Sequence, residues 1–177
     1  MKKTLKIILF VGLGILMFFL GVTWLYPYSF FSINKTVTFE PYLNGVKHYR
    51  KDIQVIKNTY QSNDQIQPIF AMYEQKWLIR EKKTQLKYDD IDMILKKVKL
   101  GRESLTQLDL ESIQPNEKED KDILIRECLT FEKDIKEIKN SRNYSRMKII
   151  KQYSDLNAGF DTSIKVFGDF YKNYVRD

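Results

Sequence analysis

The sequence contains one histidine and one cysteine in 177 residues, and this scarcity removes several classes of function. A single cysteine excludes an internal disulfide. One histidine excludes His-rich zinc sites and the paired Glu-x-x-His repeats of carboxylate-bridged metal proteins. Neither a G-x-S-x-G elbow nor a phosphate-binding glycine loop outside the apolar run occurs. We therefore expect no catalytic residue, no metal and no cofactor, and we interpret the chain as a protein without enzymatic activity.

The few residues with chemical potential have simpler structural explanations. His48 lies near the start of an expected helix and is predicted to be exposed or partly packed. Cys128 falls on an apolar stripe, which favours a small buried hydrophobe over a reactive thiol. Asp89, Asp90 and Asp92 lack the glycine and the distal glutamate of a calcium loop. Helix capping is the preferred interpretation of these three carboxylates.

Charge is absent from one long stretch, which runs from Ile7 through Leu13 and Phe19 to Tyr26. A helix of that length rises about 30 Å, which matches the hydrocarbon core of a bilayer. Such a helix satisfies its own backbone hydrogen bonds inside lipid. The stretch predicts a single transmembrane helix that contacts membrane lipid and ends before Pro27.

The same stretch has a second interpretation, as a secretion signal that is later removed. Cleavable signals have an apolar region of about 7–15 residues followed by small side chains at the cleavage site. Here the run is longer, and the bulky sequence TWLYPYSFF surrounds its end. Both features favour a signal anchor that remains in the membrane, with cleavage as the alternative.

Basic residues flank only one end of the run closely. Lys2, Lys3 and Lys6 precede it, whereas the next basic residue on the other side is Lys35. Because basic flanks stay cytoplasmic, the N-terminus is predicted inside the cell membrane and the rest of the chain outside it. The predicted organisation is a cytoplasmic stub, a span, a juxtamembrane connector and an extracytoplasmic domain, at residues 1–6, 7–26, 27–40 and 41–177.

The residues that follow the run carry a mild positive charge. They hold all 23 acidic residues and 27 of the 30 basic ones, which leaves a net charge of +4. The two signs are interspersed, as on a solvated helical surface. No Arg-rich patch or recognised motif is present, so nucleic acid is not an expected partner.

Apolar residues in the predicted domain recur at the 3–4 spacing of amphipathic helices. Three stripes are clear, and a fourth region, residues 66–113, is predicted as one long helix or two with a break near KTQLKYDD. In that region Met72, Ile79, Leu86, Met93 and Leu100 recur every seven residues, as on one helix face. The clear stripes are Val46, Tyr49, Ile53, Ile56 and Tyr60; Leu124, Cys128, Phe131, Ile135 and Ile138; and Ile149, Tyr153, Leu156, Phe160, Phe167, Phe170 and Tyr174.

The last stripe is a heptad seam in which Ser163 occupies the place of an apolar residue. Such a seam packs in the protein's own core or lines a pocket between helices or a partner's helix. Its candidate pocket or partner residues are Tyr153, Phe160, Phe167, Phe170 and Tyr174.

These patterns predict an all-α protein, with one N-terminal transmembrane helix followed by an antiparallel bundle of four or five helices. We expect an interaction or structural module that binds another membrane or envelope protein, or a second copy of itself. The alternative is an extracytoplasmic ligand-binding or sensory bundle that works through a membrane partner. The sequence leaves open whether the stripes bury within the chain or against a partner.

Overall fold

The computed structural model describes residues 2–41, 43–59, 65–108 and 115–174. This part of the chain is mostly helical, with seven helices and a helix content of 76%. The predicted helical class is therefore confirmed. Two short strands accompany the helices.

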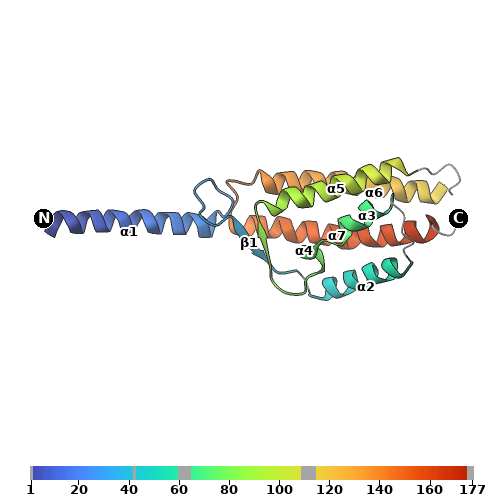
Figure 1. Ribbon diagram of the computed structural model, residues 1–177, viewed down its shortest axis with the longest axis horizontal. Helices are drawn as coiled ribbons and strands as arrows, with labels where there is room; N and C mark the ends of the chain where they lie inside the picture. The colour runs from blue at the N-terminus through green and yellow to red at the C-terminus, as the bar shows by residue number, and fades with distance from the viewer. Residues whose placement is uncertain (1, 42, 60–64, 109–114, 175–177) are drawn as a thin grey trace.

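Helix α1 (Lys2–Leu25) projects from the rest of the chain as a single rod (Figure 1). It ends two residues before Pro27, which disfavours helical backbone in the residue before it. The other elements form a separate body at the end of this rod (Figure 1). They are β1 (Thr36–Phe39), α2 (Leu43–Thr59), α3 (Gln67–Tyr73), α4 (Lys76–Ile79), β2 (Thr84–Lys87), α5 (Asp90–Gln107), α6 (Pro115–Lys139) and α7 (Arg146–Tyr174).

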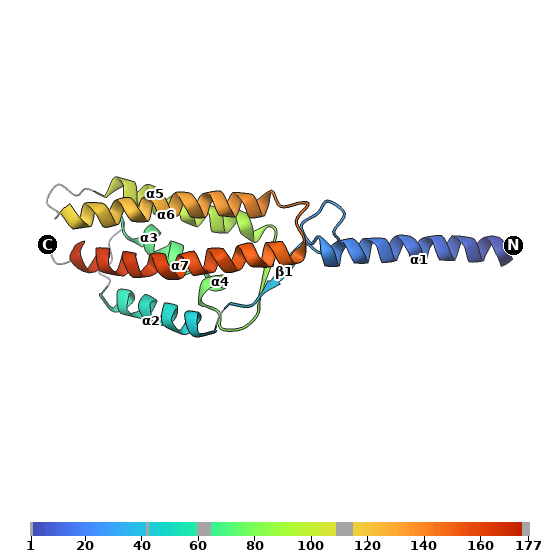
Figure 2. The ribbon, with the colours of Figure 1, turned by 180° about the vertical axis from the view of Figure 1, so that it is seen from behind.

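The long helices of the body lie side by side. Helix α6 packs against both α5 and α7, and α2 packs on the side of α7 away from α5 (Figures 1 and 2). The short helix α3 contacts α5. The two clear stripes of α6 and α7 are buried between these helices, apart from Tyr174, whose side chain lies outside the described residues. Tyr60 of the first stripe also lies outside them.

Ser163 explains why one apolar position of the α7 seam is polar. Its Oγ atom lies 2.7 Å from the hydroxyl of Tyr73, and both side chains are buried. A buried hydroxyl without a partner costs free energy, so Ser163 pairs with the polar end of an otherwise apolar side chain. The Tyr73 ring itself stacks on Phe167 with centroids 5.2 Å apart.

Residues 66–108 differ from the prediction of one or two helices. They form α3, α4, strand β2 and α5, and Leu86 points into the core from the strand. Strand β2 pairs antiparallel with β1, with Val37 opposite Leu86 and Phe39 opposite Thr84. The seven-residue recurrence through Leu86 was therefore not one helix face, and Met93 and Leu100 are exposed. A four-residue alternation is too short to outweigh helical spacing, and its pairing partner lies far away in sequence.

Candidate functional site

Helix α1 is the only described helix that is long and apolar enough to cross a membrane. None of its apolar window is buried in the protein, unlike a core helix of similar composition. Of the predicted span residues, Ile7 and Leu13 are exposed, Phe19 is half-buried, and Tyr26 is exposed one residue beyond the helix. The exposed apolar surface therefore covers nearly the whole rod.

Arg146, the first residue of α7, joins this rod to the body. Its Nε donates to the carbonyl of Trp24 at 2.7 Å, and its Nη2 donates to the carbonyl of Thr23 at 3.1 Å. Its Nη1 reaches the carbonyl of Thr36 at 3.4 Å. The last carbonyls of a helix have no partner within the helix and carry the negative end of its dipole. Because α1 has no basic residue in its own last turn, Arg146 supplies its C-terminal cap.

Tyr28 makes a second connection between the same parts. It is buried, and its hydroxyl lies 3.0 Å from that of Tyr153 on α7 and 3.4 Å from the carbonyl of Leu86 on β2. Its ring meets Tyr88 edge-on, with centroids 5.5 Å apart. Burial raises the pKa of Tyr28 to about 12 and also raises the pKa of Tyr153. The two hydroxyls therefore remain protonated and hydrogen-bonded at neutral pH.

Four of the five candidate seam residues of α7 lie in the protein's own core. Tyr153, Phe160, Phe167 and Phe170 are buried. Phe160 stacks on Phe131 of α6 with ring centroids 4.3 Å apart. Tyr174 ends α7, and its side chain lies outside the described residues. The four described seam residues fill the space between helices of one chain.

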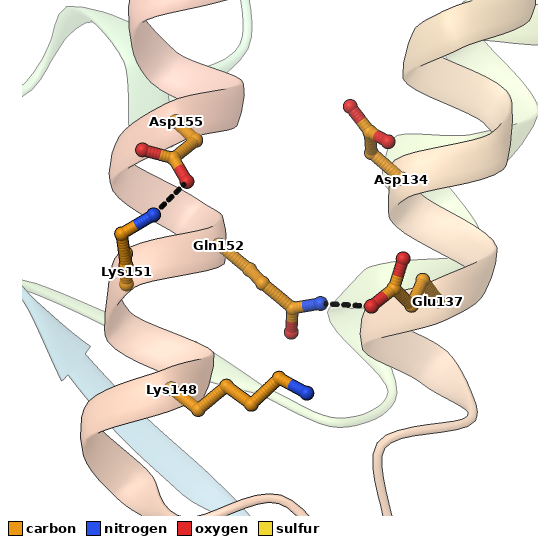
Figure 3. A pocket seen from close by; sticks show the side chains of 6 residues that line it. All are labelled: Asp134, Glu137, Lys148, Lys151, Gln152 and Asp155. Atoms are coloured by element: carbon orange, nitrogen blue, oxygen red, sulfur yellow. Dashed lines mark hydrogen bonds and ion pairs between the residues drawn. The ribbon is translucent and has the colours of Figure 1, made fainter.

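A hollow of about 290 Å³ opens between α6 and α7, and its walls carry charged side chains of both signs (Figure 3). Gln152 donates to Glu137 at 2.8 Å, and Lys151 pairs with Asp155 at 3.1 Å. Burial, with the nearby Glu137 carboxylate, raises the pKa of Asp134. Lys148, the remaining cation in Figure 3, lies over the ring of Tyr144, with Nζ 3.4 Å from its centroid. Three carboxylates and two lysines line the hollow, so their charges largely compensate one another.

Of the three carboxylates considered as metal ligands, Asp89 stands at the N-cap of α5 but makes no side-chain capping hydrogen bond, so the capping prediction is wrong for Asp89. The carboxylate of Asp90 accepts the amide hydrogen of Lys87 at 2.9 Å, at the start of α5, and Asp92 pairs with Lys139. His48 is exposed on α2. Cys128 is buried as predicted, and burial raises the pKa of its thiol to about 12. Across the described ranges, no three His, Cys, Asp or Glu side chains are placed to hold a metal ion.

A larger hollow of about 420 Å³ lies among α4, β2 and α5. Four apolar side chains, those of Trp77, Leu86, Met93 and Ile94, line it beside eight polar or charged ones, which include Arg80. The ring nitrogen of Trp77 donates to the buried amide oxygen of Gln75, at 3.3 Å.

Sequence reasoning did not find Arg146 or Tyr28. The one available indication for Arg146 was the missing basic residue at the end of the predicted span, since a helix end favours a cation. Nothing local pointed to a partner 122 residues later in the chain. A tyrosine just beyond a membrane span is typical of the aromatic belt at the interface, and buried and interfacial tyrosines look alike in sequence.

No protein family, no curated protein and no solved structure matches this chain. Its function is therefore inferred from the geometry of its own residues.

Proposed function

We propose that this chain is a single-pass membrane protein whose body is an antiparallel helical bundle on the extracytoplasmic side. The body acts as an interaction or structural module rather than as an enzyme. One observation carries the proposal: α1 leaves its apolar surface bare, and yet its end is tied to the body through Arg146. A bilayer is the environment in which such a helix loses no free energy by remaining uncovered.

The orientation follows from charge. The three lysines before the apolar run favour a cytoplasmic N-terminus, and the body then lies outside. Exposed apolar residues on the body support a protein partner, either another membrane or envelope protein or a second copy. Met93 and Leu100 are exposed seven residues apart on α5, and Leu129 is exposed on α6.

The anchor is tested by alkaline carbonate extraction of membranes and by protease treatment of intact cells and of inverted vesicles. Retention in the membrane, with the body digested only from outside, is expected. Release by carbonate, or digestion only from the cytoplasmic side, would overturn the proposal. Crosslinking in intact cells tests the partner, and a chain that crosslinks to no protein contradicts an interaction role.

The second candidate is a ligand-binding or sensory module, and the hollow beside Trp77 favours it. A ligand that binds only the folded state raises the melting temperature by mass action. A screen of small polar and apolar metabolites by thermal shift tests this candidate. A hit that Trp77→Ala abolishes would support it, whereas hits unaffected by that substitution would place the ligand elsewhere.

A further inference from the structure

The segment of residues 27–34, here called the aromatic loop, turns back beside the last turns of α1 (Figures 1 and 2). The ring of Phe31 lies 6.4 Å from the ring of Phe19, measured between centroids. The amide of Ile33 donates to the hydroxyl of Thr23 at 3.0 Å. The loop therefore follows the surface of the apolar helix back toward its N-terminus.

The outer side of the aromatic loop is apolar and uncovered. Phe30 is 78% exposed and Ile33 is 68% exposed, and Phe31 is also exposed despite its contact with α1. The loop contains no charged residue. Exposed apolar surface costs about 25 cal/mol for each Å² left in water, so contact with lipid or with another protein would stabilise this cluster.

The position of the loop along α1 favours lipid as the medium that covers these side chains. Phe19 lies six residues before the end of the helix at Leu25, which corresponds to about 9 Å along the axis. If α1 spans a bilayer and ends at the boundary between the headgroups and the acyl chains, the side chain that packs on Phe19 lies about 9 Å below that boundary. Amphipathic segments bury apolar side chains about 5–10 Å into this boundary.

Several backbone amides of the loop already have hydrogen-bond partners, which favours their entry into lipid. The amide of Ser29 donates to the carbonyl of Tyr26, just before the loop, at 3.0 Å, and the amide of Ser32 donates to the carbonyl of Ser29 at 3.2 Å. The Ile33 amide is bonded to Thr23, as described above. Each amide that already has a partner avoids the cost of losing water on entering lipid.

We propose that the aromatic loop inserts into the outer interface of the bilayer that α1 spans. The inference rests on the proposed function, because it requires an inserted α1. Lipid then holds the chain at two places, the rod and the loop. Since Tyr28, within the loop, is fixed to Tyr153, the inserted loop sets the height and tilt of the body above the membrane.

Site-specific labels on the full chain test this proposal. Single cysteines replace Phe30 in the loop, Leu13 in α1 and Leu129 on α6, the last being a matched exposed apolar residue of the body. Each carries an environment-sensitive fluorophore, and the protein is placed in phosphatidylcholine vesicles with quenchers attached near the headgroup or deep in the acyl chain. The unsubstituted chain, whose one thiol is buried, is the labelling blank.

The inference expects strong quenching of the Phe30→Cys label by the shallow quencher, of the Leu13→Cys label by the deep quencher, and of the Leu129→Cys label by neither. Quenching at position 13 without quenching at position 30 would overturn the loop inference and leave the anchor intact. No quenching at position 13 would overturn the proposed function as well. A loop that is covered by a partner protein instead of lipid would give quenching at position 13 without quenching at position 30.

A second measurement separates insertion from folding. In a Phe31→Cys background, Phe30→Ser with Ile33→Ser is expected to abolish quenching at position 31, whereas Met93→Ser with Leu100→Ser leaves it unchanged. Circular dichroism confirms that each variant retains its helix content. Unchanged quenching after the loop substitutions contradicts insertion driven by these side chains.

Discussion

At the residue scale, the paired hydroxyls of Tyr28 and Tyr153 hold the juxtamembrane segment in the core. Tyr28→Phe leaves the Tyr153 hydroxyl buried without this partner, and Tyr153→Phe leaves that of Tyr28 with one weaker contact, to Leu86. We expect each single substitution to lower the free energy of unfolding by roughly 1–3 kcal/mol. The double substitution removes both hydroxyls and is expected to cost less than the sum of the two.

Chemical denaturation of the full chain in detergent, followed by circular dichroism, completes this double-mutant cycle. Additive single effects would mean that the two hydroxyls do not interact in the folded state.

The same tyrosines predict a dependence of stability on alkaline pH. The folded pKa of Tyr28 is about 12, against an ordinary value of 10.0, and the pKa values of Tyr49, Tyr73 and Tyr153 are raised by burial as well. In this range the unfolded chain releases protons that the folded chain retains. The contribution of Tyr28 to the free energy of unfolding is thus complete below pH 10 and is lost as pH rises toward 12.

Unfolding titrations in detergent between these two pH values measure the slope. Tyr28→Phe with Tyr153→Phe is expected to make the loss shallower, because two of the four groups no longer titrate. An equal slope in that variant would assign the alkaline loss to other groups.

At the element scale, two glycines of α7 predict opposite effects of one substitution. A Cβ at Gly159 would lie 2.8 Å from Cε1 of Phe131, a ring that is already stacked on Phe160 and has little room to move. A Cβ at Gly168 would make an ordinary contact with Ile56 at 3.5 Å. Alanine favours a helix interior over glycine by about 1 kcal/mol.

We therefore expect Gly168→Ala to raise the melting temperature and Gly159→Ala to lower it, because the forced contact outweighs the gain in helix propensity. Thermal unfolding of the two variants measures these shifts in melting temperature, and each variant is the matched control of the other. Two shifts of the same sign would show that propensity or packing alone governs both positions.

Helices α6 and α7 could be predicted from sequence because each repeats its apolar residues over several turns. Their stripes are buried, apart from Tyr174, which lies outside the described side chains. Strand β2 could not be predicted, since a strand of four residues is stabilised by its pairing with β1 and not by its own pattern. The polar residue within the seam, Ser163, is explained only by Tyr73, which comes from another helix.

At the scale of the whole molecule, Arg146 connects the end of the rod to the first turn of α7 in the body. Arg146→Ala leaves the carbonyls of Thr23 and Trp24 without this partner at the end of α1. A buried unpaired carbonyl costs roughly 1–3 kcal/mol, and the cost is smaller here because the bond to Trp24 is exposed to water. We expect the fixed relation between α1 and the body to be lost.

Distances between spin labels at positions 13 and 129, measured in vesicles, report on this relation. Arg146→Ala is expected to broaden the distribution of distances, and Arg146→Lys to broaden it partly, because an ammonium lacks the planar fork of donors. Arg142→Ala, at an exposed arginine in the preceding turn, is the matched control. If Arg146→Ala gives a distribution as narrow as that of Arg142→Ala, Arg146 does not hold the end of α1 against the body.

The sequence by itself determined the apolar rod and the amphipathic helices. These depend on side-chain size and charge repeated at short spacing along one segment, which is a local property. Only the tertiary structure decided that the α7 seam is buried within the chain, that β1 pairs with β2, that Arg146 caps α1 and that the aromatic loop folds back on the rod. Each of these is a contact between segments that are separated in sequence, and the free energy of such a contact is specified by both partners together.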